Sequence, residues 1–302
     1  MTIVITTPTG NTGRRVARSL IESGTDVAVL ARNPDKLEPV IRQNARLYQG
    51  SVEDADRFVQ ATREAEALYL VVPYNFGTSN LRDWQRQVGK AAATAIETNS
   101  IPYVVMLSSN GAHLPKGIGP ISGLHDVEQM LNSVAQTFVH LRPGFFMENY
   151  LMQVDAIRTA NRVFLPIGGD RRLAMIATQD IADIAVKLLL DRSGSGQSVL
   201  GLHGAADLSF NEAAAILGQV LGQPIAHVQT TLDQFHATLL QMEATENVAS
   251  EYVEMWSGLA HPDYAPAEPR TPETTTPTTF AEFVKQKMLP LLKASLAANP
   301  AP

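Results

Sequence analysis

The chain begins with a β-branched run that passes through a glycine-containing turn directly into a helix-forming stretch. Residues Ile3–Thr6 are all β-branched, Thr7–Gly13 contains two glycines, and Arg14–Glu22 has the apolar spacing of an amphipathic helix. A strand that leads through a tight turn into a helix is the start of a βα unit, whose strands pair in parallel. This feature excludes all-α and all-β folds for the N-terminal part of the chain.

The alternation of short β-branched runs and longer amphipathic stretches continues through the first half of the chain. We expect strands at Ile3–Thr6, Val27–Ala31, Arg46–Gln49, Ala67–Val72, Tyr103–Leu107 and Thr137–Leu141. We expect helices at Arg14–Glu22, Asp54–Thr62, Leu81–Thr98 and His125–Ser133. The strands are continuous apolar runs, which is typical of a parallel sheet covered by helices on both faces. The sequence therefore predicts an α/β fold with a doubly wound parallel sheet.

The pattern becomes less regular after Arg142. We expect helices at Asp180–Leu190 and at Ser209–Leu221, where Ser209 and Glu212 form a capping box, and a short closing helix at Thr279–Leu292. Pro262–Pro277 holds five prolines, so we expect irregular structure that runs over the surface. We divide the chain into residues 1–150, which bind a dinucleotide, and residues 151–302, a smaller portion that packs on the first.

Composition and charge exclude several classes of function. The 302 residues carry 24 basic and 30 acidic side chains, and this net charge of −6 argues against binding to nucleic acid or an anionic membrane. The chain has no cysteine, which excludes disulfides, thiolate catalysis and cysteine–zinc sites and fits a reducing cytoplasm. No apolar stretch approaches the roughly 18 residues of a spanning helix, and the N-terminus is no secretory signal. We therefore expect a cytoplasmic protein.

The turn at residues 7–13 has the context of a dinucleotide-binding fingerprint. Gly10 would let the backbone approach a pyrophosphate, and Gly13 would let the helix pack close to the strand. The N-terminus of this helix would offer free N–H groups to the phosphates. Thr7 stands where a first glycine is usual, which is a departure from the fingerprint. The alternative interpretation is a tight βα loop that binds no ligand.

The end of the second predicted strand indicates which dinucleotide would bind. About twenty residues after Gly10, an acid would bond the ribose 2′-hydroxyl of NAD, but the chain has Arg32 there, with Lys36 nearby. A guanidinium suits the 2′-phosphate of NADP. The alternative is that both cations only solvate a loop.

Several segments together resemble the NmrA-like family of atypical short-chain dehydrogenase/reductases, over residues 1 to about 220. These segments are the turn, Arg32–Lys36, Gly50–Asp54, Leu141–Asn149 and Ile176–Ala182. The resemblance implies a Rossmann fold with a small α+β C-terminal substrate-binding portion and NADP(H) across the strand ends. It implies that Gly50 and Ser51 lie near the adenine, Val71–Pro73 along the cofactor, and Ser108 and Ser109 beside the nicotinamide. The expected cofactor-binding set is Thr7, Thr9, Gly10, Asn11, Thr12, Gly13, Arg32, Lys36, Gly50, Ser51, Val72, Pro73, Ser108, Pro143, Gly144 and Phe145.

The catalytic candidates are His125 and Ser108. None of the seven tyrosines has a lysine four residues later, so the Tyr-x-x-x-Lys pair of ordinary short-chain dehydrogenases is missing. His125, which we place at the start of its helix, could donate a proton to a reduced oxygen, or it could only bond backbone. Ser108 could bond substrate or only cap a strand. His125 and Glu128 alone are too few ligands for a metal, so we expect none.

Two functions remain open from the sequence. The first is an NADPH-dependent oxidoreductase that transfers hydride to a quinone-like or other electrophilic small molecule. The second is a non-catalytic NADP(H)-binding redox sensor that acts through a protein partner, and a homodimer is equally compatible. The basic cluster Arg14, Arg15 and Arg18 suggests a solvated helix face rather than a DNA contact. A set of apolar side chains could line a pocket for a planar substrate or simply pack the core: Tyr74, Phe76, Phe145, Phe146, Met147, Tyr150 and Trp256.

Overall fold

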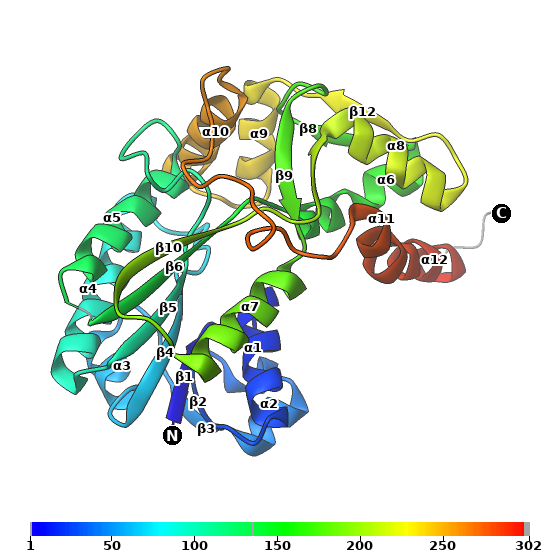
Figure 1. Ribbon diagram of the computed structural model, residues 1–302. Helices are drawn as coiled ribbons and strands as arrows, with labels where there is room; N and C mark the ends of the chain where they lie inside the picture. The colour runs from blue at the N-terminus through cyan, green and yellow to red at the C-terminus, as the bar shows by residue number, and fades with distance from the viewer. Residues whose placement is uncertain (1, 135, 299–302) are drawn as a thin grey trace.

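A parallel sheet of seven strands forms the centre of the molecule (Figure 1). The computed structural model describes residues 2–134 and 136–298, with side chains up to residue 293. All neighbouring strands of this sheet pair in parallel. In spatial order they are β10 (Gly196–Leu202), β6 (Thr137–Pro143), β5 (Tyr103–Leu107), β4 (Ala65–Val71), β1 (Thr2–Thr6), β2 (Asp26–Ala31) and β3 (Arg46–Gln49).

Helices cover both faces of this sheet, as predicted. One face packs against α1 (Asn11–Glu22), α2 (Pro39–Asn44) and α7 (Thr178–Asp191). The other packs against α3 (Ala55–Ala61), α4 (Leu81–Asn99) and α5 (Pro120–Asn132). Every residue of β1 and β5 is buried, because both strand faces meet apolar helices. Each large aliphatic side chain buried there contributes about 1.5–3 kcal/mol.

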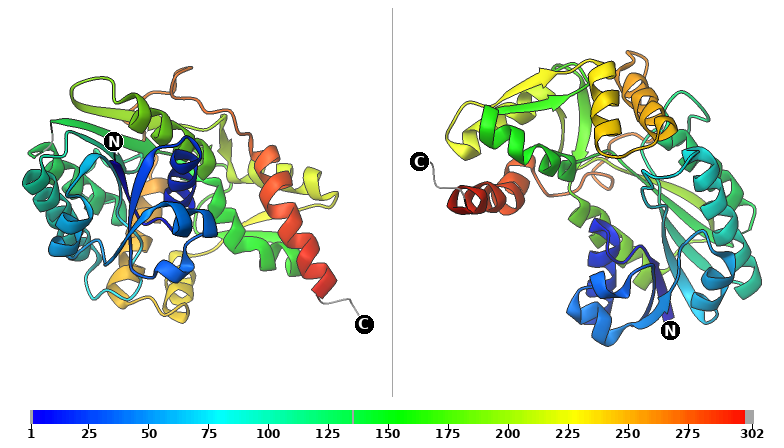
Figure 2. Two further views of the ribbon diagram at one scale, coloured as in Figure 1. Left: turned by 90° about the horizontal axis from the view of Figure 1, so that it is seen from below. Right: turned by 180° about the vertical axis from the view of Figure 1, so that it is seen from behind.

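A smaller α+β portion lies beyond the carboxyl ends of the main sheet (Figures 1 and 2). It holds two small sheets, one of β11 (Ala206–Ser209), β9 (Arg172–Ile176) and β7 (Phe145–Phe146), the other of β12 (Ala226–Gln229) and β8 (Arg162–Leu165). Its helices are α6 (Val154–Ala160), α8 (Phe210–Leu221), α9 (Leu232–Gln241), α10 (Glu246–Ala260), α11 (Phe280–Phe283) and α12 (Leu289–Ala298). Their apolar faces form a separate core cluster around Phe210 and Trp256.

Later segments return to the first half of the chain. Strand β10 extends the main sheet beside β6, and α7 packs against α1, where Arg15 and Asp183 form an ion pair at 2.8 Å. Val248 and Ala249 of α10 join the core on the face of α4 and α5. The two halves are therefore interleaved.

Residues 262–277, which we call the strap, cross between the two portions without a helix or strand, as the prolines predict. The strap is tied near its middle and just beyond its last residue. Glu268 pairs with Arg142 of β6 at 2.6 Å, and just after the strap Thr278 donates to Asp180 of α7 from both its backbone N–H (3.0 Å) and its hydroxyl (2.5 Å). Most of the strap is exposed, but Thr276 is buried, so the expected surface course holds only in part.

Two predicted helix starts are too late. Helix α1 begins at Asn11 rather than at Arg14, directly after its N-cap Gly10. Helix α5 begins at Pro120 rather than at His125, because Gly119 at the N-cap and proline at the first helical position start the helix early. His125 therefore lies in the second turn of α5. The predicted capping box of α8 is confirmed, with Ser209 and the N–H of Glu212 bonded at 3.1 Å. Among the described residues, no helix is both long and apolar enough to cross a membrane.

Candidate active site at the carboxyl ends of the strands

The chain reverses its winding direction at β1, which pairs with β2 on one side and β4 on the other. In open α/β sheets, ligands bind in the crevice outside the carboxyl ends of the strands at such a switch point. The predicted site residues follow six of these strands: β1, β2, β3, β4, β5 and β6. The structure therefore brings the predicted set to one edge of the sheet.

The turn after β1 is shaped as the glycines predicted. A Cβ on Gly13 would collide with the carbonyl oxygen of Thr7, so only glycine permits this approach of α1 to the strand end. The N–H of Gly10 bonds the same carbonyl at 3.0 Å. Thr7 adopts φ +50°, a conformation that a β-branched residue rarely takes and that the usual glycine would take without strain.

The N-terminus of α1 suits an anion. No side chain caps it, and its first turn contains no acidic residue. The N–H groups of that turn and the helix dipole are therefore available to a phosphate. Thr9, Gly10 and Asn11 are exposed at this end, whereas Thr12 is buried.

The side chain of Thr6 fixes the crevice at its base, a role that the sequence did not reveal. Its hydroxyl donates to the carbonyl of Tyr69 at 3.1 Å and accepts from the N–H of Val71 at 2.8 Å. These bonds join the ends of β1 and β4, the two strands between which the winding reverses.

Arg32 and Lys36 lie exposed after β2. In the part of the chain that the structure describes, neither side-chain cation has a hydrogen bond or an ion pair. Arg14 and Arg18, by contrast, both pair with Glu38 at 3.4 Å and 3.6 Å, as expected for a solvated helix face. Two unpaired cations at the end of β2 are therefore free to bind an anionic group.

The residues after β3 and β4 continue the same edge. The N–H of Gly50 bonds the carbonyl of Ala31 at 3.1 Å, and a Cβ on Gly50 would lie 2.8 Å from the Cβ of Arg57. Ser51 donates to Glu53. Val72 and Pro73 are half-buried at the end of β4.

Ser108 is part of a buried charged network that the sequence did not reveal. Its hydroxyl lies 2.5 Å from the Glu128 carboxylate, which also binds the Arg142 guanidinium in a two-point contact of 3.0 Å and 2.5 Å. Arg142 also pairs with Glu268 of the strap. The available signal was Arg142 itself, because a charge inside a buried strand requires an opposite charge. The proton of Ser108 is committed to Glu128, which leaves only the oxygen lone pairs.

His125 is held by backbone. Its Nδ1 lies 2.8 Å from the carbonyl oxygen of Ala112 in the loop after β5, so Nδ1 carries a proton. The other ring nitrogen, Nε2, is then an acceptor in the neutral ring and a donor only in the imidazolium. No group of three metal-ligating side chains occurs among the described residues.

Polar atoms beside this network lack partners. Asn110 Oδ1, His113 Nδ1 and Glu268 Oε2 are buried without a hydrogen bond within the described residues. Burial lowers the pKa of His113, while the nearby Glu268 opposes that shift. The loop after β5 and the strap therefore carry buried polar atoms with unused hydrogen-bonding capacity.

Pro143, Gly144 and Phe145 lie where β6 passes into the second portion. The N–H of Gly144 bonds the carbonyl of Leu202, and a Cβ on Gly144 would collide with the carbonyl of Ala174. Phe145 packs 5.9 Å from Trp256, centroid to centroid.

The seven apolar candidates for a substrate pocket separate into groups. Phe145, Met147, Tyr150 and Trp256 belong to the core of the second portion, and Phe146 packs against the core on the α1 face. Tyr74 and Phe76 instead lie at the surface after β4.

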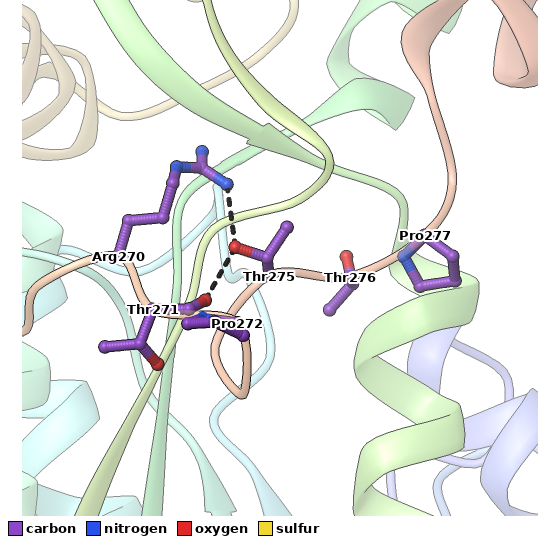
Figure 3. Close-up of a pocket in the computed structure, with 6 residues that line it drawn as sticks. All are labelled: Arg270, Thr271, Pro272, Thr275, Thr276 and Pro277. Atoms are coloured by element: carbon purple, nitrogen blue, oxygen red, sulfur yellow. Dashed lines mark hydrogen bonds between the residues drawn. The ribbon is translucent and has the colours of Figure 1, made fainter.

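A cavity of about 510 Å³ lies against the strap (Figure 3). It is lined by Arg270, Thr271, Pro272, Thr275, Thr276 and Pro277, so none of the predicted site residues lines it. The hydroxyl of Thr275 donates to the carbonyl of Thr271 at 2.7 Å, which folds the strap back on itself there.

Comparison with known families identifies the chain. The model of the NmrA-like family matches residues 1–284, nearly the whole length. The chain belongs to the NmrA-like family. A relative of this NmrA-like protein, the NAD(P)H azoreductase of Xenophilus azovorans, is 30% identical over 288 residues, which cover 94% of this chain and 96% of that one.

Solved structures share the Rossmann fold of this NmrA-like protein. The NADPH-dependent quinone oxidoreductase of Escherichia coli, complexed with NADPH, has a TM-score of 0.75 at 21% identity and covers 94% of this chain and 98% of its own. The Citrobacter triphenylmethane reductase complexed with NADP(H) has a TM-score of 0.78 at 15% identity and covers 94% and 99%.

Proposed function

We propose that the protein is an NADPH-dependent oxidoreductase that transfers hydride to a quinone-like, azo or other electrophilic small molecule. The observation that carries this proposal is the uncapped N-terminus of α1, which Gly13 brings against the strand end at the switch point. The azoreductase relative and the reductase folds support the reaction class.

The described residues fit a dinucleotide. The turn of Thr7–Gly13 would hold the pyrophosphate through N–H groups, and Gly50 and Ser51 would border the adenine. Arg32 and Lys36, whose side chains have no partner among the described residues, would bind the 2′-phosphate that distinguishes NADPH from NADH. When bound, the nicotinamide supplies the hydride. Val72, Pro73, Ser108 and the Pro143–Phe145 segment would position the ring and exclude water.

The proton for the reduced substrate requires a second group. We assign this role to the imidazolium form of His125, because the carbonyl of Ala112 holds Nδ1–H and only in this form does Nε2 carry a proton to donate. Ser108 would orient substrate by accepting a hydrogen bond, since its own proton is held by Glu128. Residues 151–302 would then supply the substrate side of the cleft.

The Ser108 hydroxyl donates to Glu128 and the His125 Nδ1–H donates to Ala112, so neither proton is available to a substrate. This also favours a second function, a redox sensor that binds NADP(H) without turnover and signals through a protein partner. A site whose serine proton is held in an internal bond can bind the dinucleotide without supplying a proton to a substrate.

Oxidation of NADPH, followed at its nicotinamide absorbance with a panel of quinones and azo dyes, separates the two functions. We expect turnover with at least one acceptor, and a reduction of kcat on the order of a hundredfold in His125→Ala at unchanged NADPH affinity. Tight NADPH binding without turnover across the panel would instead support the sensor.

A further inference from the structure

Two aromatic rings lie at the surface directly after β4, and a third ring, from α10, packs against them. The Tyr74 and Phe76 rings are nearly parallel, with centroids 6.3 Å apart and planes 11° apart. The ring of Tyr252, from α10, lies 5.8 Å from Phe76 and 6.3 Å from Tyr74. Tyr74 is 67% exposed, although large aromatic side chains usually gain stability from burial. We call these three residues the aromatic cluster.

The aromatic cluster borders the candidate cofactor crevice. Tyr74 directly follows Pro73, and β4 is one of the two strands at the switch point. Tyr252 of α10 contacts the rings of Tyr74 and Phe76, and α10 packs against α4 and α5, which places α10 beside the loop that follows β4. A ligand that extends outward from the carboxyl end of β4 would therefore meet these rings.

Hydrogen bonds hold the loop that carries two of the rings. Thr245, the N-cap of α10, donates from its backbone N–H to the carbonyl of Phe76 at 3.0 Å and from its hydroxyl to the carbonyl of Thr78 at 2.6 Å. Asn247 accepts from the N–H of Leu81 at 2.8 Å. The backbone that carries the exposed rings is thus held before any ligand binds, which lowers the entropic cost of ordering this loop on binding.

A second set of rings continues from α9 toward the end of β6. Phe235 of α9 lies 6.1 Å from Trp256, which in turn lies 5.9 Å from Phe145. Phe235 also packs against the core cluster that Tyr252 joins. Trp256 is only 5% exposed, so this second set of rings packs the core, and it is the aromatic cluster at the end of β4 that presents rings to a ligand.

We propose that the aromatic cluster is a subsite for the second ring of an extended planar acceptor, one in which an electrophilic bond links two separate aromatic rings. This inference rests on the proposed function, because the first ring and the electrophilic bond would lie over the nicotinamide. Flat, fixed and exposed rings favour stacking with a planar aromatic group. A single-ring quinone would not reach the subsite, so the cluster determines specificity rather than basal turnover.

The test uses binding, which does not depend on turnover. The protein saturated with NADP⁺, which has no hydride to give, is titrated with the uncharged dye 4-(dimethylamino)azobenzene, and the change in dye absorbance gives a Kd. We expect Tyr74→Ala to raise this Kd about fivefold to tenfold and Tyr74→Phe to restore it. Leu190→Ala is the control. It removes another exposed apolar side chain, near the C-terminal end of α7, and should leave the Kd of the dye unchanged.

Steady-state kinetics with NADPH then separate the subsite from the function. Tyr74→Ala should leave the KM for 1,4-benzoquinone unchanged. The subsite is overturned if wild-type protein does not bind the dye, if Tyr74→Ala binds it normally, or if the benzoquinone KM rises equally. If Tyr74→Ala weakens dye binding but no acceptor is reduced, the subsite holds and the oxidoreductase function fails.

Discussion

The guanidinium of Arg142 lies 2.5 Å from the carboxylate of Glu128, with side chains only 9% and 1% exposed. Glu128→Gln removes one of the two carboxylates that bind Arg142 and leaves the buried guanidinium paired with Glu268 alone. We therefore expect Glu128→Gln to lower the free energy of unfolding by about 3 kcal/mol, the lower end of the range for a broken buried pair, measured by urea denaturation. Glu64→Gln is the control, because Glu64 pairs with Arg46 at the surface and should leave the urea midpoint nearly unchanged. An equal loss of unfolding free energy in both variants would show that the buried pair of Glu128 and Arg142 contributes no more than a surface pair.

Substituting the two glycines of the first turn should have different effects, on stability for Gly13 and on NADPH binding for Gly10. Gly13→Ala drives a methyl group into the carbonyl of Thr7, so we expect a loss of about 1–3 kcal/mol in unfolding free energy. Gly10→Ala fits sterically, with its Cβ 3.4 Å from that carbonyl and an ordinary φ of −79°. Its methyl would instead occupy space beside the phosphates. We expect normal thermal stability but weaker NADPH binding, and normal NADPH affinity in Gly10→Ala would place the pyrophosphate elsewhere.

Arg32 should distinguish the two dinucleotides. A charged hydrogen bond contributes about 1.5–3 kcal/mol, so we expect Arg32→Ala to raise the Kd of NADPH by roughly ten- to a hundredfold and to leave that of NADH unchanged. Fluorescence titration of both nucleotides measures this. Arg42→Ala is the matched control, since Arg42 is exposed on α2 and already paired with Asp35. Equal losses for NADPH and NADH in Arg32→Ala would mean that Arg32 does not bind the 2′-phosphate.

Buried histidine predicts a stability that falls in acid. Burial lowers the pKa of His140 below its ordinary value of 6.5. The carboxylate of Glu128 opposes this shift, and the guanidinium of Arg142 adds to it. Nε2 lies 2.8 Å from the side-chain oxygen of Asn132, and Nδ1 is buried without a partner in the described part of the chain, so protonation would bury an unpaired N–H.

The sign follows from this depressed pKa. Below about pH 6.5 the unfolded chain takes up a proton that the native ring does not, so the contribution of His140 is complete above that pH and is lost as pH falls through the native pKa. Urea midpoints at pH 7.5 and 5.5 should show a drop that is smaller in His140→Gln. His261→Gln, at an exposed histidine, should keep the wild-type drop. If His140→Gln leaves the drop in urea midpoint unchanged, His140 is not the origin of the pH dependence.

The sequence predicted the parts of the fold that local patterns determine. The six expected strands of the first half and the order of site residues along their ends followed from β-branched runs and turns. The start of α5 was wrong because Gly119 and Pro120 read as loop, although proline is favoured in a first helical turn. Short strands such as β8 and β12 went unpredicted, since each has only four residues and gains its order from a distant partner.

The charged network could not be predicted for a related reason. Arg142 signals that some carboxylate must reach it, but Glu268 comes from a segment 126 residues later, with no pattern that links the two. Likewise, the lack of a partner for Arg32 is a property of the folded surface and not of the residues beside it.

The strap also sets an order of events during synthesis of the chain. The ribosome releases Arg142 long before Glu268, so a nascent chain that has already formed β5, α5 and β6 has Glu128 available to Arg142 but not the second carboxylate. The last strand of the sheet, β10, also emerges after β6. The N-terminal portion therefore leaves the ribosome with the edge of β6 unpaired and with Arg142 bound to only one of its two final carboxylates, and it gains the second only after Glu268 has been synthesised.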